Sequence, residues 1–369
     1  MHMKPTNKVP LLPMLVVASM LAQLGCEEKS SRPVPVEPYK AVLLGTYADD
    51  GQGDWGVIML DIDSEDETLT GEAVIRSRAH DDPFLHVYLK GSMDGEDMEL
   101  DLDTDKVPYQ YELTILATKG PGDDLAGAIS YPAGGLEAEF EASVLEQADA
   151  QVQDFVDLDI SSKGLAFDGE DIWVSTITSD YVIMNLEGVF EDTVVVLLWE
   201  EAHWTSDALT SDGTHLWGHL PVTVGGGGVA LNQSEIKEFT KEGMVVDSFR
   251  IPHRTTGLAS DGEFLWSLKA ESDSLFRFDG EGAIQEGIEL PLPDLVDIDY
   301  DGAHFWGIGW FMKRLYKIDG AGEVLRVYHL PCEGGNVFPS GIVFDGEHFW
   351  YGVNTVYLDS RVYKVAVGP

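Results

Sequence analysis

Apolar and polar side chains alternate in short runs through residues 39–150, and turn residues separate the runs. The segment Met98-Glu99-Leu100-Asp101-Leu102-Asp103 is the clearest case, because an extended chain would place its apolar side chains on one side and its acids on the other. The pattern predicts strands at about 40–47, 56–62, 70–77, 84–92, 97–103, 109–118, 124–131 and 135–146. Sequential strands with short connections favour a small eight-stranded antiparallel barrel-like domain, in which closure removes exposed sheet edges.

The barrel has two possible interiors. A barrel of this size is either filled with side chains, which we expect here, or holds a small apolar ligand. The opening Gly45-Thr46-Tyr47 resembles the start of lipocalin and avidin-type barrels.

A different pattern occupies residues 151–369, where one phrase recurs five times. Each copy has an apolar stretch, an Asp-Gly pair and a tryptophan five residues after the aspartate. The aspartates are residues 168, 212, 261, 301 and 345, and the tryptophans are residues 173, 217, 266, 306 and 350. A repeat of 40 to 49 residues made of short strands predicts a propeller blade, so the region is expected to form a five-bladed β-propeller.

Each copy divides into four strands, with Asp-Gly forming the turn between the first and the second. The last copy ends with its third strand, near Val367. Residues 152–159 precede the first copy and have the pattern of an unused outer strand. We expect them to complete the last blade and close the ring, and we expect the repeat tryptophans to pack between neighbouring blades.

The phrase Gly164-Leu-Ala-Phe-Asp-Gly-Glu170 resembles bacterial propellers with NHL-type repeats and the plant-type glutaminyl cyclotransferases. The resemblance spans roughly residues 152–369 and implies the fold. In the enzyme family an acidic residue and tryptophans at the channel mouth carry the activity. The corresponding stretch here, His253-Arg-Thr-Thr-Gly257, contains no carboxylate.

The N-terminal segment predicts export. Lys4 and Lys8 precede an apolar run from Val9 to Gly25, and Leu24-Gly25-Cys26 resembles a bacterial lipoprotein lipobox. The resemblance implies that Cys26 is acylated, with residues 1–26 as signal peptide and the Pro-rich residues 27–38 as a tether. We therefore expect a lipid-anchored protein of the cell envelope, at the outer membrane or cell surface.

The composition is strongly acidic, with 23 Lys and Arg against 65 Asp and Glu and a formal net charge of −42. This charge excludes nucleic acid as a partner and leaves the lipid anchor as the only expected membrane contact. It also favours a monomer. The second cysteine, Cys332, leaves the mature fold without an internal disulfide framework.

No cofactor is expected, and calcium is the alternative. Asp101, Asp103, Asp105 and Glu112 have the spacing of an EF-hand loop, but Lys106 stands where that loop requires glycine. The Asp-Gly turns collect further acids on one face of the ring, which turn chemistry and solubility explain and cation binding could also explain.

The opposite face of the propeller is the predicted site, because scarce bases and two tryptophans outside the repeat phase fall on its loops. The candidate ligand-binding residues are Lys163, His203, Trp204, His253, Arg254, Lys269, Trp310 and Lys313. They predict a module that binds a polar or anionic small molecule, a glycan or a protein, without assigned catalytic or metal-binding residues. A propeller enzyme of cyclotransferase type is the alternative.

Overall fold

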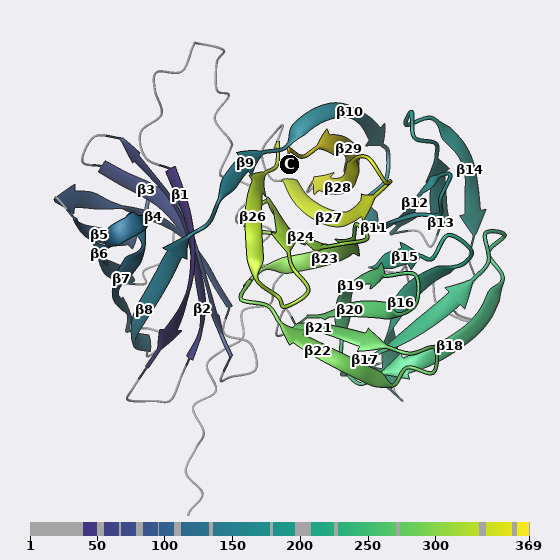
Figure 1. Ribbon diagram of the computed structural model, residues 1–369, viewed down its shortest axis with the longest axis horizontal. Coiled ribbons are helices and arrows are strands. Elements are labelled where there is room, and N and C mark those ends of the chain that lie inside the picture. Colours follow the sequence, from purple (N-terminus) through teal and green to yellow (C-terminus); the bar gives the residue numbers. More distant parts are fainter. Residues whose placement is uncertain are drawn as a thin grey trace, which may run out of the picture.

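The computed structural model describes residues 40–49, 55–65, 68–78, 84–94, 96–106, 112–132, 136–177, 180–195, 208–224, 228–270, 274–331, 337–355 and 360–368. Two all-β bodies lie side by side, a closed barrel and a five-bladed propeller (Figure 1). The only helical element in these ranges is a single short turn, η1 (Pro121–Asp123), and none is long and apolar enough to cross a bilayer. The signal segment, the tether and Cys332 lie outside the described residues.

The barrel confirms the predicted N-terminal architecture. Its strands follow one another around the wall, and β1 pairs with both β2 and β8 to close it. They are β1 (Lys40–Ala48), β2 (Trp55–Glu65), β3 (Thr68–Ser77), β4 (Phe84–Asp94), β5 (Asp97–Leu102), β6 (Thr114–Lys119), β7 (Leu125–Tyr131) and β8 (Leu136–Val144).

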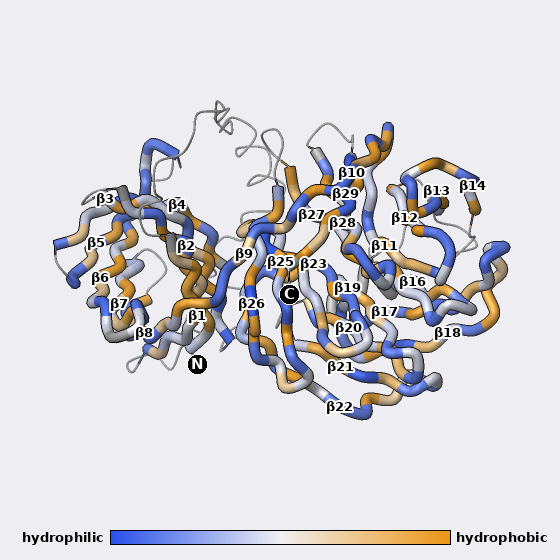
Figure 2. Tube along the Cα trace, turned by 45° about the horizontal axis from the view of Figure 1, so that its top comes forward, coloured by the Kyte–Doolittle hydropathy of each residue, from blue (hydrophilic) through white to orange (hydrophobic). Residues whose placement is uncertain are grey.

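The barrel interior is packed with side chains. In β5 and β8 exposed and buried residues alternate strictly along most of the strand, as the sequence pattern requires. Leu43, Ile58 and Ile115 are among the inward side chains, and all three are fully buried. Along many strands of the molecule blue and orange segments alternate (Figure 2).

The propeller has five four-stranded blades, whose first strands surround the central axis. Blade 1 contains β11 (Ser162–Phe167), β12 (Ile172–Thr176), β13 (Asp180–Met184) and β14 (Phe190–Val195). Blade 2 contains β15 (Leu209–Ser211), β16 (Leu216–Val224), β17 (Gly228–Phe239) and β18 (Val245–Ile251), and blade 3 contains β19 (Thr255–Ser260), β20 (Leu265–Lys269), β21 (Ser274–Phe278) and β22 (Ile284–Glu289). Blade 4 contains β23 (Leu295–Tyr300), β24 (Phe305–Gly309), β25 (Arg314–Ile318) and β26 (Val324–His329).

Blade 5 joins the two ends of the propeller region, as predicted. Its strands from the C-terminal repeat are β27 (Val337–Phe344), β28 (Phe349–Thr355) and β29 (Ser360–Ala366). The outer strand is β10 (Gln151–Leu158), which precedes blade 1 in sequence and pairs antiparallel with β29. This pairing satisfies the edge of β29 and closes the ring.

The repeat tryptophans occupy the interfaces between blades, which confirms their predicted packing. Trp266 contacts Phe305 of the next blade with ring centroids 4.8 Å apart, and Trp306 contacts Phe349 at 4.4 Å. Trp350 packs against blade 1 and Trp173 against blade 2. Trp217 is half-buried at the interface between blades 2 and 3.

One short strand differs from the sequence prediction. We expected the eighth run of the small domain to continue to residue 146 and that domain to end at residue 150. Instead β8 ends at Val144, and β9 (Gln147–Asp149) pairs in parallel with β26 at the outer edge of blade 4. The linker between the domains is therefore part of a propeller sheet.

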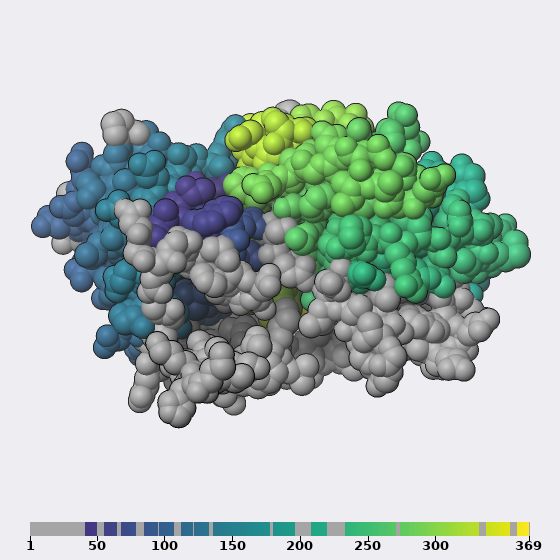
Figure 3. All heavy atoms as spheres, turned by 90° about the horizontal axis from the view of Figure 1, so that it is seen from below, coloured from purple at the N-terminus to yellow at the C-terminus, as the bar shows by residue number. Residues whose placement is uncertain are grey.

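The barrel packs directly against blades 3 and 4 (Figure 3). Val42, Met59 and Val74 of the barrel wall join the apolar core around Leu290 and Tyr316 of the propeller. The two domains therefore share one continuous core. The barrel wall also forms part of the surroundings of the nearby propeller loops.

Candidate functional site

The Asp-Gly turns define one face of the propeller, and the structure explains their acids. In four copies the aspartate accepts a hydrogen bond from the indole N–H of the repeat tryptophan, at 2.7–2.8 Å. Its other oxygen accepts the backbone N–H groups two and three residues later, as at Asp168 and Asp261. The following glycines have φ between 86° and 97°, a region that favours glycine.

The pKa of the Asp168 carboxyl reflects these bonds. Burial alone would raise it, but the backbone N–H of Asp171, the Lys241 ammonium 2.9 Å away and the Trp173 indole lower it overall. The Asp168 carboxylate thus stabilises the turn and the repeat tryptophan. No cluster of three or more metal-ligating side chains occurs among the residues that the structure describes. In the barrel, Lys90 pairs with Asp103 and Asp105 of the EF-hand-like spacing.

The loops between blades and after the second strands form the opposite face, which we call the loop face. Arg254 is exposed there, and its carbonyl accepts the N–H of Ala270 at 3.0 Å. Lys269, the residue before Ala270, ends β20 and is half-buried. This backbone hydrogen bond joins the two segments that carry these predicted bases.

The other predicted residues of the loop face belong to other segments of the chain. Trp310 is half-buried between Phe311 and Phe338, with ring centroids 4.9 and 5.4 Å away. Lys313 follows in the same loop and has a φ of +51°. Lys163 lies on β11 in blade 1. His203 and Trp204 lie outside the described residues.

His253 is a predicted ligand-binding residue that the structure buries. Only 4 % of it is exposed, and its Nε2 atom lies 2.8 Å from the Ser267 hydroxyl. The ring packs on Phe276 and Phe278. Burial, assisted by the charge of Lys269, lowers the pKa of His253 to about 4, so the imidazole is neutral at pH 7. Its contacts are those of a packed core residue.

The barrel adds residues to the loop face that sequence reasoning missed. The Arg76 guanidinium donates to the carbonyls of Pro293 and Ala270, at 2.9 and 2.8 Å. Arg78 donates to the carbonyl of Leu290 at 2.8 Å. These bonds hold Ala270, which follows β20, and residues 290–293, which follow β22. No periodic pattern in the sequence relates these arginines to loops about 200 residues away.

A charged network continues along the seam between the domains. Arg314 of the propeller forms an ion pair with Asp61 of the barrel, and His86 lies 3.0 Å from Glu72. Burial would raise the pKa of Glu72, but His86 and the charges of Arg314 and Lys313 lower it overall. The charge of Lys313 therefore acts on a carboxylate of the barrel.

Two buried acids of β23 were also missed as functional positions. Asp297 replaces the Gly or Ala of the other copies, and it accepts the N–H of Ile342 in the next blade at 3.0 Å. Asp299 accepts the N–H of Phe344 at 2.6 Å. Burial raises the pKa of Asp297 well above its usual range and that of Asp299 to about 7. These side chains tie blade 4 to blade 5.

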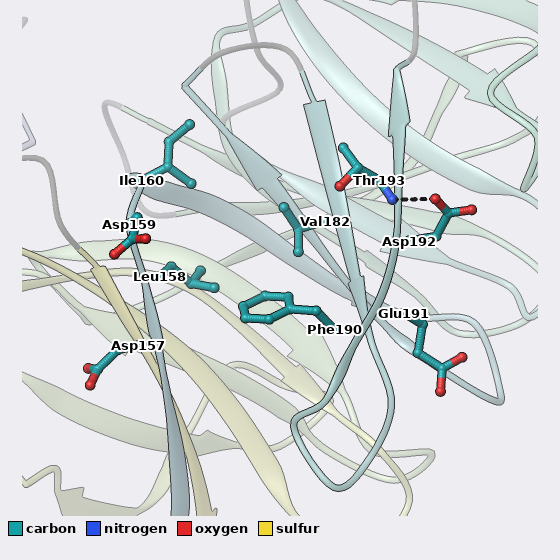
Figure 4. Close-up of a pocket in the computed structure, with 9 residues that line it drawn as sticks. All are labelled: Asp157, Leu158, Asp159, Ile160, Val182, Phe190, Glu191, Asp192 and Thr193. Carbon is teal, nitrogen blue, oxygen red and sulfur yellow. Dashed lines mark hydrogen bonds between the residues drawn. The ribbon is translucent and has the colours of Figure 1, made fainter.

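A separate groove lies on the rim of the ring, between β10 and β14 (Figure 4). It has a volume of about 450 Å³, and its apolar side chains are those of Leu158, Ile160, Val182 and Phe190. Four acids border it, namely Asp157, Asp159, Glu191 and Asp192. The Asp192 carboxylate accepts the N–H of the next residue, Thr193, at 2.7 Å, the bond that is dashed in Figure 4.

The comparisons with known proteins concern the fold. No protein-family model matches the chain, and no curated protein matches it. Among solved structures, the chain is similar to glutaminyl cyclase of Myxococcus xanthus, at 15% identity over 61% of this chain and 100% of that chain, with a TM-score of 0.48. A gluconolactonase of Xanthomonas campestris is 14% identical over 73% of this chain and 90% of that chain, with a TM-score of 0.37. BamB of Moraxella catarrhalis is 10% identical over 86% and 81%, with a TM-score of 0.28. At these identities and scores the similarities do not bear on activity.

Proposed function

We propose that the protein is a lipoprotein of the cell envelope whose propeller binds a polar or anionic ligand at the loop face. The observation that carries the proposal is the Arg254–Lys269 pair. In a chain with a net charge of −42, two bases lie on segments that a backbone hydrogen bond joins, and Arg254 is exposed. Guanidinium and ammonium groups on neighbouring segments suit carboxylate, sulfate or phosphate groups.

The surroundings of the pair support binding. Ala270, which follows Lys269, is held by Arg76, so this position is fixed before any ligand arrives. Trp310 lies on the same face with Phe311 and Phe338, which gives an aromatic surface for a sugar ring or an apolar group. A surface that is formed before binding and offers a few charged groups to a ligand is typical of a binding protein.

Removing the pair should weaken ligand binding. We expect Arg254→Ala/Lys269→Ala to raise the Kd for an oligogalacturonate probe roughly tenfold or more, because two charge-assisted contacts are lost. Calorimetric titration at fixed salt measures the change. The matched control is Lys106→Ala/Lys119→Ala, which removes the same charge from the barrel. Equal Kd values for both double variants would contradict the proposal.

The anchor is tested separately, because ligand binding does not require it. We expect the full chain expressed in a bacterium to fractionate with membranes and Cys26→Ser to appear in the soluble periplasmic fraction, since a serine cannot receive the thioether-linked lipid. Immunoblotting of the fractions after a carbonate wash provides the readout. A Cys26→Ser protein that remains in the membrane pellet would show that lipidation at Cys26 is not the anchor.

A further inference from the structure

The outer strands of the five blades share a local irregularity. In each of them one residue bulges out of the ladder, and a charged residue follows at once. The charged residues are Asp154 in β10, Asp192 in β14, Asp247 in β18, Glu286 in β22 and Arg326 in β26. Each charged residue is followed by one residue whose backbone N–H lies at the outer edge of the blade. The five blades differ in what this N–H binds.

Three of the blades cap this donor themselves. The Asp154 carboxylate accepts the N–H of Phe155 at 2.8 Å. Asp192 accepts from Thr193, and Asp247 accepts from Ser248, both at 2.7 Å. An outer strand whose N–H is bound to its own side chain is a poor template for another strand, so these caps protect three edges of the ring.

The fourth blade uses the same donor for strand addition. The N–H of Val327 in β26 donates to the carbonyl of Glu146 at 2.8 Å, and β9 continues the pairing in parallel. Arg326, the charged residue of this edge, forms an ion pair with the Glu146 side chain. The incoming strand therefore carries the charge opposite to that of the residue after the bulge.

Blade 3 has neither arrangement. The Glu286 carboxylate lies 3.4 Å from Arg277 on the neighbouring strand, and among the described residues the Gly287 N–H has no backbone partner outside the β21–β22 ladder. Gly287 has no side chain, and a Cβ atom there would lie 3.1 Å from the Phe276 ring. Residues 284–287 are all exposed.

We propose that the outer edge of β22 binds an extended, lysine- or arginine-containing segment of a partner protein by strand addition, as β26 binds β9. The backbone would supply the affinity and Glu286 the preference for a basic side chain, since it stands where Arg326 pairs with Glu146. Asp279, Glu281 and Glu289 extend the acidic edge. A second copy of this chain is disfavoured by its charge of −42. This edge is separate from the loop face.

Two charge-conserving substitutions test the proposal. Glu286→Asp should install the cap seen at Asp192, and Asp247→Glu should remove a cap and open the edge of β18. The probe is an acetylated and amidated heptapeptide of alternating lysine and valine, measured by calorimetric titration at 150 mM salt. We expect one site in the wild type, a roughly tenfold weaker Kd in Glu286→Asp, and two sites in Asp247→Glu.

A peptide control separates strand pairing from charge attraction. The same heptapeptide with N-methylated valines keeps its charge but loses alternate N–H donors, and we expect it to bind at least roughly tenfold more weakly. Hydrogen exchange should show slower exchange at residues 284–289 when the unmethylated peptide is bound. Equal binding of both peptides, or a Kd unchanged in Glu286→Asp, would overturn the proposal.

Discussion

Trp350→Ala is expected to lower the free energy of unfolding by about 3–5 kcal/mol, the range for truncating a buried aromatic side chain. Only 1 % of Trp350 is exposed, and it packs against Leu165 and Ile172 where the last blade meets the first. Its indole N–H donates to Asp345 at 2.7 Å. The substitution thus leaves a cavity and an unfilled acceptor at the seam that closes the ring. Urea unfolding followed by circular dichroism measures the loss.

A second tryptophan of the same repeat position provides the control. Trp217 is half-buried at the interface between blades 2 and 3, so Trp217→Ala should cost clearly less than Trp350→Ala. Trp350→Phe should fall between wild type and Trp350→Ala, because it keeps part of the packing but lacks the N–H. If Trp217→Ala and Trp350→Ala were equally destabilising, burial at the closing seam would not be the cause.

The architecture was predictable because each blade repeats the same local requirements. The Asp-Gly pair needs a residue that tolerates positive φ, and the tryptophan needs a neighbouring blade to cover it, so both recur at fixed spacing. The strand before the first copy was recognisable because the last copy lacks an outer strand. The role of the aspartates was only partly predicted. Their bond to the tryptophan five residues later became visible with the side-chain positions.

Contacts between unrelated segments were not predictable in the same way. Residues 147–149 directly follow the predicted eighth barrel strand, and nothing in their sequence reveals that β26 is their partner. Arg76 and Arg78 bind backbone carbonyls, which every residue possesses, so no sequence pattern marks the acceptors. Pairings of this kind depend on how the two domains meet.

The predicted site also contains features that the sequence could reveal and features that it could not. The ladder of blade 3 joins the segments that carry Arg254 and Lys269, which strand order alone could suggest. His253 precedes Arg254 in the same loop, but Phe276 and Phe278 draw its ring into the blade. The position of a residue in a loop therefore predicts the face of the propeller on which it lies. It does not predict whether the side chain is buried, because that depends on the neighbouring strand. The ligand-binding role of the loop face stays a prediction.

Asp299→Asn is expected to change how stability depends on pH. The pKa of Asp299 is about 7 because the carboxyl is buried, against 3.8 in an unfolded chain. Between these values the folded state holds a proton that the unfolded state releases, so this group's contribution to stability is present at low pH and is lost as pH rises to 7. The loss is at most about 4 kcal/mol, from 1.36 kcal/mol per pKa unit. Asparagine keeps an acceptor for the Phe344 N–H and never ionises.

The difference in unfolding free energy between Asp299→Asn and wild type should therefore increase from pH 4.5 to about pH 7 and then level off towards pH 8, as measured by urea unfolding across that range. Asp301→Asn is the matched control, since the pKa of Asp301 is lowered overall and its contribution is lost only below about pH 4. A parallel change in both variants would contradict the assignment to Asp299.

The contribution of His253 to stability changes with pH in the opposite direction to that of Asp299. Together they shape the dependence of wild-type stability on pH. Its pKa is about 4 in the folded state against 6.5 in an unfolded chain, so its contribution is lost as pH falls from 6.5 to 4, by about 3 kcal/mol. The rise from His253 and the fall from Asp299 offset each other over most of this interval. Asp297, whose pKa is also raised by burial, opposes His253 in both proteins, so the test is the difference between them. Relative to wild type, Asp299→Asn should gain stability as pH rises towards 7, and His253→Gln should remove the rise between pH 4 and 6.5 from either background. A wild-type curve as steep as that of Asp299→Asn would show that Asp299 ionises freely in the fold.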